Sequence, residues 1–198
     1  MGLDLQYSEG QTPLDGEERE GLKIPTINTQ ADLDQFEQLN VEKAVAWSLT
    51  AKVKAEEVLT EEFIKELHKR MFGEVWKWAG RFRQSNKNLG IEWTKISVEL
   101  RSLIDDTKFW IEQETYPPTE IAIRFKYRIV SIHCFPNGNG RHSRLMADLI
   151  MQFIFSKEPF NWQRSNMVKA DRIRTTYIQA LQSADKGNIG PLVEFAVC

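Results

Sequence analysis

The segment His133–Arg144, HCFPNGNGRHSR, lies between two apolar helical patterns. Before it, Ile121, Phe125 and Ile129 recur at helical spacing, and after it the run LMADLIMQFIF indicates another helix. Glycine, asparagine, histidine and arginine fill most of the connection between the two patterns. The segment therefore predicts two helices joined by a loop, and packing alone does not explain the composition of that loop.

The start of the second helix, near Asn139 or Gly140, has an unusual charge. Its first turn contains Arg141, His142 and Arg144 and no acidic residue. A cation in this position costs roughly 0.3–1 kcal/mol, because the N-terminus of a helix carries a partial positive charge. Backbone N–H groups at a helix start, preceded by a glycine-containing loop, bind phosphate. The turn therefore predicts a site for an anion, and a phosphate chain would fit it.

His133 comes directly before this loop, at the end of an apolar helix. Histidine is the side chain best suited to take a proton from a hydroxyl near neutral pH. A histidine at a helix end is more often structural, but its place beside a phosphate site favours a general base that activates an alcohol. We expect Phe135 to anchor the loop in the core. His68, on a core-facing helix, is expected to be structural.

The rest of the chain predicts an all-α fold with one small β-hairpin. Helices are expected at 29–52, 60–72, 97–113, 119–132, 139–156 and 168–183, with threonine caps at 29, 60 and 119 and a short last helix from Pro191. The segment GRFRQSNKNLGIEWTKIS breaks the helical pattern and predicts a hairpin or flap at about 82–96. We expect a single domain over 29–198, preceded by an arm, 1–28, that lies on it or is partly mobile.

Composition excludes several classes of protein. The 198 residues carry a net charge of −2, which argues against a protein that binds the backbone of nucleic acid directly. The two cysteines form no C-x-x-C pair, the N-terminus lacks the pattern of a signal peptide, and the longest apolar run is too short to cross a bilayer. An HNH-type nuclease is excluded by the ligand spacing. A cytoplasmic location without membrane contact is expected.

HCFPNGNGRHSR resembles the signature of the Fic family, His-x-Phe-x-(Asp/Glu)-Gly-Asn-Gly-Arg-x-x-Arg. LHKRMFGEVWKWAGRFR is similar to the segment that leads into that family's flap. TPLDGEEREGL and FEQLNVEKAVAWSL are similar to a stand-alone bacterial branch called mobile mystery protein B. The resemblance implies a Fic-type helical bundle with a small β-hairpin flap.

It also implies a protein adenylyltransferase. His133 would be the base that activates a Tyr, Ser or Thr hydroxyl of a target protein for attack on the α-phosphate of ATP. The nucleotide would be held by Phe135, Gly138, Asn139, Gly140, Arg141 and Arg144, the arginines holding its β- and γ-phosphates. The target would pair with the backbone of the flap, at Lys87, Asn88, Leu89 and Gly90.

The sequence departs from the family pattern at two places. Asn137 stands where the family has an acidic ligand for Mg²⁺, and an amide oxygen can bind the ion but adds no charge. The family's inhibitory motif, whose glutamate pairs with the second arginine, has no match. Glu37, in LDQFEQ, is the nearest candidate. Inhibition is expected from a small antitoxin-like partner, as in toxin–antitoxin pairs, or from Glu37 in a degenerate motif, and the partner is favoured.

Two other functions stay open. One is phosphotransfer of the γ-phosphate, as in the related Doc type, which the intact GNGR sequence disfavours. The other is a nucleotide-binding regulatory or interaction module whose catalysis is weakened by Asn137. A gain of activity in Asn137→Asp would favour a weakened enzyme over this module.

Overall fold

The computed structural model describes residues 12–50, 53–162 and 170–198, and the fold in this part of the chain is helical. Short helical turns occur at Trp93–Lys95 (3₁₀) and Ile150–Ile154 (π). The described residues form no strand, and only one isolated bridge, between Leu22 and Trp76, has β geometry. The all-α class is confirmed. In chain order the α-helices are α1 (Gly16–Glu20), α2 (Gln30–Thr50), α3 (Ala55–Val58), α4 (Glu61–Phe72), α5 (Ile96–Glu112), α6 (Pro118–Ile132), α7 (Asn139–Leu149), α8 (Ala170–Asp185) and α9 (Gly190–Val197).

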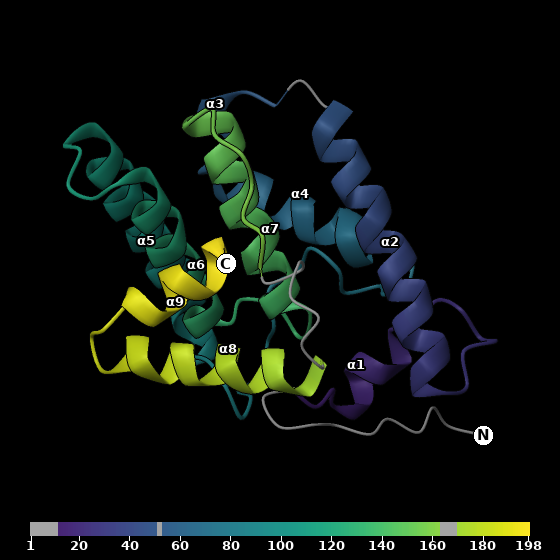
Figure 1. Ribbon diagram of the computed structural model, residues 1–198. Coiled ribbons are helices and arrows are strands. Elements are labelled where there is room, and N and C mark those ends of the chain that lie inside the picture. The colour runs from purple at the N-terminus through teal and green to yellow at the C-terminus, as the bar shows by residue number, and fades with distance from the viewer. Residues whose placement is uncertain (1–11, 51–52, 163–169) are drawn as a thin grey trace.

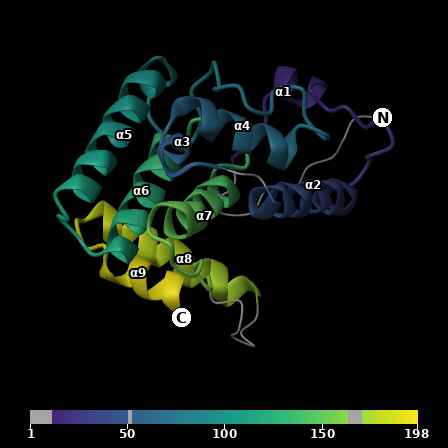
Figure 2. The same ribbon diagram turned by 90° about the horizontal axis from the view of Figure 1, so that it is seen from above.

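The helices α6 and α7 form the centre of the fold (Figures 1 and 2). Helix α5 packs against α6, helix α4 against α7, and α2 covers α4 on the outer side. The pair α8 and α9 closes the bundle next to α6. Helix α6 is buried on more than one side, as expected for a central helix, at Ile121, Ala122, Ile123, Phe125, Lys126, Ile129 and Ile132. The loop between α6 and α7 therefore lies at one end of the core.

Helix starts follow the capping residues in two of three cases. The side chain of Thr60 accepts the backbone N–H of Phe63, and Thr29 accepts that of Asp32. The expectation that Thr119 caps the helix before the loop is wrong. Helix α6 begins at Pro118, because proline is tolerated in the first turn, where its missing N–H has no partner to lose.

The flap at 82–96 has no paired strands, so the expected β-hairpin is not formed. The buried guanidinium of Arg83 lies between the two limbs of the flap. It occupies backbone carbonyl groups that would otherwise be available for pairing between strands. It donates to the carbonyls of Ser85 (2.8 Å), Ile91 and His133 (2.6 Å). Both limbs therefore bond to one side chain instead of to each other.

Residues 12–28 run along the surface of the bundle. Helix α1 begins with a capping box between Asp15 and Glu18 and was not expected, because five residues are too few to show periodicity. Farther along, the Lys23 N–H donates to the carbonyl of Val75 at 2.8 Å. The arm is thus joined to the segment that follows α4.

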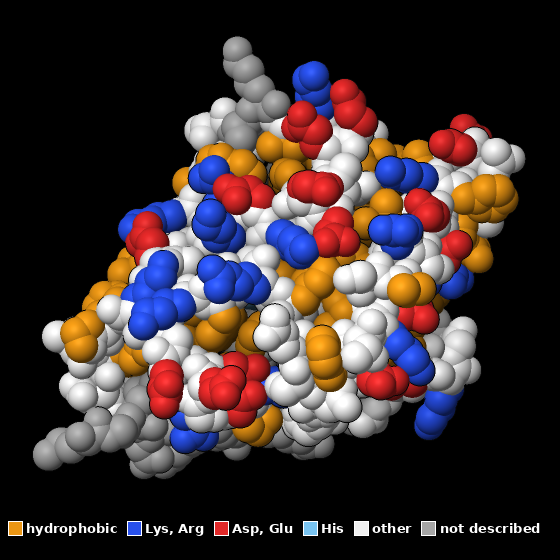
Figure 3. All heavy atoms as spheres, turned by 180° about the vertical axis from the view of Figure 1, so that it is seen from behind, with side chains coloured by type: hydrophobic (Ala, Val, Ile, Leu, Met, Phe, Trp, Pro, Cys, Tyr) orange, Lys and Arg blue, Asp and Glu red, His pale blue; other side chains and the backbone are white. Residues whose placement is uncertain are grey.

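The surface has no single dominant charge on the face that Figure 3 shows, where acidic and basic side chains are interspersed. This agrees with the near-neutral composition. Within the described ranges, none of the helices combines the length and the apolar composition needed to span a bilayer.

Candidate active site

His133 ends helix α6 in a left-handed conformation, with φ 58° and ψ 60°. Helices usually place glycine in this conformation, because other side chains are strained there by roughly 1–3 kcal/mol. Its backbone N–H still donates to the Ile129 carbonyl, at 3.2 Å. Glu114, Ser156 and Trp162 also have positive φ, so the left-handed backbone accounts for the sharp end of α6 and does not by itself assign a role to the His133 side chain.

The imidazole of His133 is only 6% exposed and faces the N-terminal arm. Its Nε2 lies 3.0 Å from the Thr12 hydroxyl. A hydrogen bond to the backbone of Val130 uses the other ring nitrogen, so Nε2 can accept the Thr12 proton. Burial lowers the pKa of His133 to about 4, and the charges of Arg83 and Lys87 act in the same direction. The ring is therefore neutral at pH 7, as a base must be.

The loop after His133 is held by its own side chains. The Asn139 side chain forms two hydrogen bonds with the backbone of Phe135. Its Oδ1 accepts the Phe135 N–H at 3.0 Å, and its Nδ2 donates to the Phe135 carbonyl at 2.8 Å. The Phe135 ring is fully buried, as expected, and stacks on His68 with 3.7 Å between ring centroids. Asn139 thus orients the loop from inside, and its side chain does not face an open nucleotide site.

His68 supports the loop from α4. Its Nδ1 accepts the Gly80 N–H at 3.0 Å, so Nε2 carries the proton and donates to the Asn137 carbonyl, also at 3.0 Å. Burial lowers its pKa well below the usual 6.5. The structural role expected for His68 agrees with these contacts. Its direct bond to the loop could not have been inferred from sequence, because the two residues are 69 positions apart.

The two glycines at the start of α7 differ, because Gly138 is buried against Phe72 and only Gly140 has open space beside it. Gly138 has φ 78°, and a Cβ there would come within 2.5 Å of the Phe72 ring. Gly140 has nothing within 4 Å of the place where a Cβ would be. The first N–H groups of α7 have no carbonyl partner within the helix. These features fit the predicted anion site.

Arg141 forms an ion pair with Glu37, the residue that the sequence indicated as a possible inhibitor. Its Nη2 lies 2.6 Å from the Glu37 carboxylate, which also accepts the Trp76 Nε1 hydrogen at 2.6 Å. The guanidinium lies over the Phe72 ring, 4.7 Å from its centroid. Glu37 thus bonds to the first arginine of the motif, whereas the family pattern implies pairing with the second.

Arg144 lies one turn further along α7, near α8. Its guanidinium is 5.7 Å from the centroid of Tyr177, whose hydroxyl accepts a hydrogen bond from Lys126. Lys126 is fully buried, and burial followed by the charge of Arg144 lowers its pKa well below 10.5. Burial also raises the pKa of Tyr177 to about 12. Nothing in the sequence pattern indicated this buried lysine.

Both the oxygen and the nitrogen of the Asn137 side-chain amide form hydrogen bonds. Oδ1 accepts the Gly138 N–H at 2.6 Å, and Nδ2 donates to the Thr12 carbonyl at 3.3 Å. No group of three metal-binding side chains occurs in the part of the chain that the structure describes. One neutral oxygen fits Mg²⁺ only as a secondary ligand, so the ion would enter bound to the phosphates of its nucleotide.

The flap residues differ in their surroundings. The Lys87 ammonium is 2.6 Å from Glu18 and 3.0 Å from Asp15, both in the arm, and its side chain is only 6% exposed. Asn88 and Leu89 are exposed. Gly90, with φ 96°, lies against His133, and a Cβ there would come within 2.5 Å of the His133 Cβ. The flap therefore touches the histidine on one side and the arm on the other.

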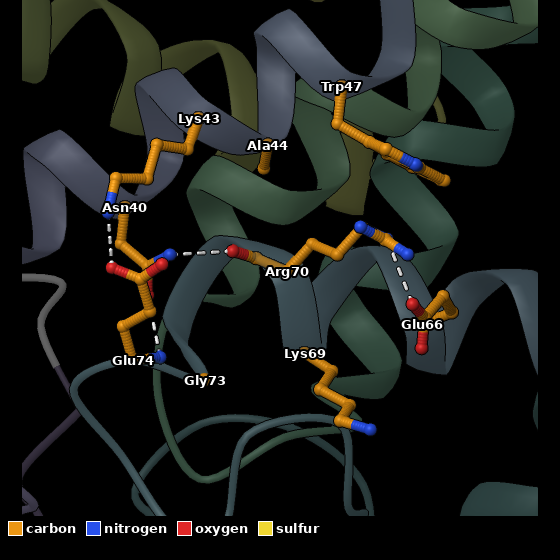
Figure 4. A pocket seen from close by; sticks show the side chains of 9 residues that line it. All are labelled: Asn40, Lys43, Ala44, Trp47, Glu66, Lys69, Arg70, Gly73 and Glu74. Carbon is orange, nitrogen blue, oxygen red and sulfur yellow. Dashed lines mark hydrogen bonds and ion pairs between the residues drawn. The ribbon is translucent and has the colours of Figure 1, made fainter. Parts of the chain in front are cut away.

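Among the hollows on the described surface, the two that stand out are not lined by His133. One, of about 290 Å³, lies between α2 and α4 and holds the pairs Lys43–Glu74 and Arg70–Glu66 (Figure 4). The other, of about 400 Å³, lies beside the flap and is lined by Arg83 and Trp93 among others. Arm and flap cover the histidine itself.

Residues 58–151 match the model of the Fic/DOC family. A "Protein adenylyltransferase Fic" from Nematostella vectensis is 26% identical over 168 residues, 82% of this chain and 37% of that protein. The chain spans about a third of the length of the curated relatives it matches.

Two solved structures share the fold. Fic-1 (residues 134–508) from C. elegans has a TM-score of 0.68 at 24% identity, covering 96% of this chain and 56% of that one. The BepC protein of Bartonella tribocorum, solved with bound AMPPNP, has a TM-score of 0.64 at 18% identity and covers 95% and 92%. The solved structures show the shared fold, and the family model over residues 58–151 together with the curated relatives places the chain in the Fic/DOC family.

Proposed function

We propose that this protein is an adenylyltransferase that moves AMP from ATP to a hydroxyl side chain of a target protein. The observation that carries the proposal is the 3.0 Å approach of a threonine hydroxyl to Nε2 of the neutral His133. A base must lie within hydrogen-bond reach of the proton that it removes. The names of the relatives, protein adenylyltransferases, support the same activity.

In this mechanism His133 takes the proton of the target hydroxyl as the oxygen attacks the α-phosphorus. The α-phosphate lies at the start of α7, where Asn139 and Gly140 supply backbone N–H groups, and the Gly138 N–H joins them once it is released from the Asn137 side chain. Arg141 and Arg144 bind the β- and γ-phosphates as a charged fork. Pyrophosphate then leaves. Most of the rate comes from positioning and charge neutralisation, and the base adds about 10²–10⁴-fold.

ATP enters with Mg²⁺ on its phosphates, and Asn137 can add one neutral oxygen. The BepC structure, solved with AMPPNP, supports a nucleoside triphosphate as co-substrate. The flap binds the target segment through its backbone near Leu89 and Gly90, in the manner of strand addition. Tyr, Ser and Thr all carry a suitable hydroxyl.

Restraint of the activity is proposed to come from Glu37. Its carboxylate is bonded to the Arg141 guanidinium. In the proposed mechanism that guanidinium binds the β- and γ-phosphates. A small antitoxin-like partner in a bacterial cytoplasm remains the second proposed restraint, on the resemblance alone. The two differ in one respect, because the Glu37 contact is present without any partner.

Radioactive ATP tests the function directly. Purified protein, Mg²⁺ and cell lysate are incubated with ATP labelled at the α- or the γ-phosphate, beside His133→Ala. We expect covalent α-label on protein, lost in the mutant. Label from the γ-phosphate would indicate Doc-type phosphotransfer. Binding of ATP without any label, in both wild type and Asn137→Asp, would favour the regulatory module.

A further inference from the structure

The N-terminal arm brings a hydroxyl of this same chain to the base. Thr12 is 6% exposed, and its Oγ1 lies 3.0 Å from Nε2 of His133. Its carbonyl accepts a hydrogen bond from the Asn137 side chain at 3.3 Å. One residue of the arm is therefore bonded both to the histidine and to the loop that begins the phosphate site.

The position of Thr12 is fixed by contacts on the residues that follow it. Leu14 is buried in the core cluster. Asp15 and Glu18 hold Lys87, and the Ser85 hydroxyl donates to Asp15 at 3.2 Å. The arm thus runs between the flap and the His133 loop, which is the passage that a target segment would have to use.

These contacts give Thr12 the geometry of an acceptor. An acceptor hydroxyl must donate its proton to the base and present its oxygen to the phosphorus held at the helix start. The first condition is met by the bond to Nε2. The second is consistent with the bond from Asn137, because that residue immediately precedes the glycine turn of α7.

We propose that Thr12 is an intramolecular adenylylation site; this rests on the proposed function. The Thr12 Oγ1–H proton passes to Nε2 of His133 as an Oγ1–Pα bond forms. The bond between Pα and the bridging oxygen breaks, and the electron pair leaves with pyrophosphate. The product is a phosphodiester between Thr12 and adenosine.

The added nucleotide changes the arm. An adenylyl group on Oγ1 is too large for the buried position that the threonine occupies, and it removes the proton that bonded to His133. The modified residue therefore leaves the base, which opens the passage between flap and loop to other hydroxyls. Self-modification is in this way a single-use step that precedes transfer to a target.

The test uses the full chain, ATP and Mg²⁺, with intact mass and peptide mapping as readouts. We expect one adenylyl group on the peptide that contains Thr12, none in Thr12→Ala, and retention in Thr12→Ser. Thr26→Ala, at an exposed threonine of the same arm, is the matched control and should be modified like the wild type. The fraction modified per minute should not depend on protein concentration.

A mixing experiment separates modification in cis from modification in trans. His133→Ala retains Thr12 but lacks the base, so it should stay unmodified beside active wild-type chain. Adenylylation of His133→Ala in the mixture would overturn the intramolecular proposal.

The outcome in lysate separates this proposal from the function itself. Label on lysate proteins with none on Thr12 overturns the acceptor role and leaves the adenylyltransferase intact. If Thr12→Ala also increased the label on lysate proteins, the arm would be an inhibitory segment that blocks the site and not an acceptor. No label on any protein overturns both proposals.

Discussion

The Glu37 carboxylate joins α2 to the start of α7, with Oε2 2.6 Å from Nη2 of Arg141 and Oε1 2.6 Å from Nε1 of Trp76. The glutamate is buried, whereas the arginine is about one third exposed. A phosphate that binds Arg141 must therefore replace a carboxylate that is already desolvated and hydrogen-bonded. This competition makes the glutamate a suitable brake.

Glu37→Gln should tighten ATP binding. The amide keeps an acceptor for Trp76 but loses the charge that holds Arg141. Hydrogen bonds to charged groups contribute about 1.5–3 kcal/mol, so we expect a gain in affinity of about 10–100-fold, measured by titration calorimetry. Glu74→Gln, which breaks an exposed pair with Lys43, is the control and should bind like the wild type. Equal affinity in all three proteins would exclude the brake.

Asn137→Asp should lower the Mg²⁺ concentration needed for transfer. A carboxylate is a stronger ligand for a hard cation than an amide, and it can still accept the Gly138 N–H. It also loses the donor to the Thr12 carbonyl, which loosens the arm. The two effects are separated by a Mg²⁺ titration of the labelling rate. A shifted midpoint indicates the metal, and a raised maximum at an unchanged midpoint would contradict the ligand role.

Gly90→Ala should separate the flap from the base. The new Cβ would approach the His133 Cβ to 2.5 Å and Nη2 of Arg83 to 2.9 Å, at a φ of 96° that disfavours alanine. We expect a loss of about 1–3 kcal/mol in the free energy of unfolding and a larger loss of labelling. Gly16→Ala, where nothing lies within 4 Å, is the control. A variant with normal stability and activity would show that the flap moves away from His133 without cost.

Stability should fall as pH decreases from 7 to 5. Burial lowers the pKa of His133 and His142 from 6.5 to about 4 and that of His68 well below 6.5. Between these values the unfolded chain binds more protons than the folded one, so acid favours unfolding. Each histidine contributes up to about 1.4 kcal/mol per pH unit in this range. Urea unfolding at several pH values measures the slope.

His142→Gln gives the internal check for this slope. Glutamine can still donate to the Ile64 carbonyl, the partner of His142, but it does not titrate. Whatever its effect on stability at pH 7, the variant should lose about one histidine's share of the pH dependence. An unchanged slope would mean that His142 takes up its proton in the folded state.

The parts of the structure that the sequence predicted are those set by local spacing. Ile121, Phe125, Ile129 and Ile132 recur at helical intervals and are all buried, and Thr60 caps α4 as expected. The loop from His133 to Arg144 could be interpreted for the same reason. Its glycines, arginines and His133 fall within twelve residues, so their proximity needed no knowledge of the fold.

The remaining contacts join distant parts of the chain. Thr12 and His133 are 121 positions apart, and Arg83 and the carbonyl of His133 are 50 apart. No periodicity relates such residues, so the arm in the site and the guanidinium in the flap were not predicted. The hairpin expected at the flap followed from local turn signals, and the buried Arg83 replaced its ladder.

Arg83 bonds the flap to the end of α6, so that the two should move together. The same guanidinium bonds to Ser85 in one limb, to Ile91 in the other and to the carbonyl of His133. A displacement of the flap therefore carries the backbone of the base with it. Under the proposed function, a segment docked along the flap would keep the same offset from the imidazole whatever its side chains are. In the proposed mechanism, the alignment of a substrate with His133 would therefore depend on one arginine, and the identity of the substrate would be decided by other contacts.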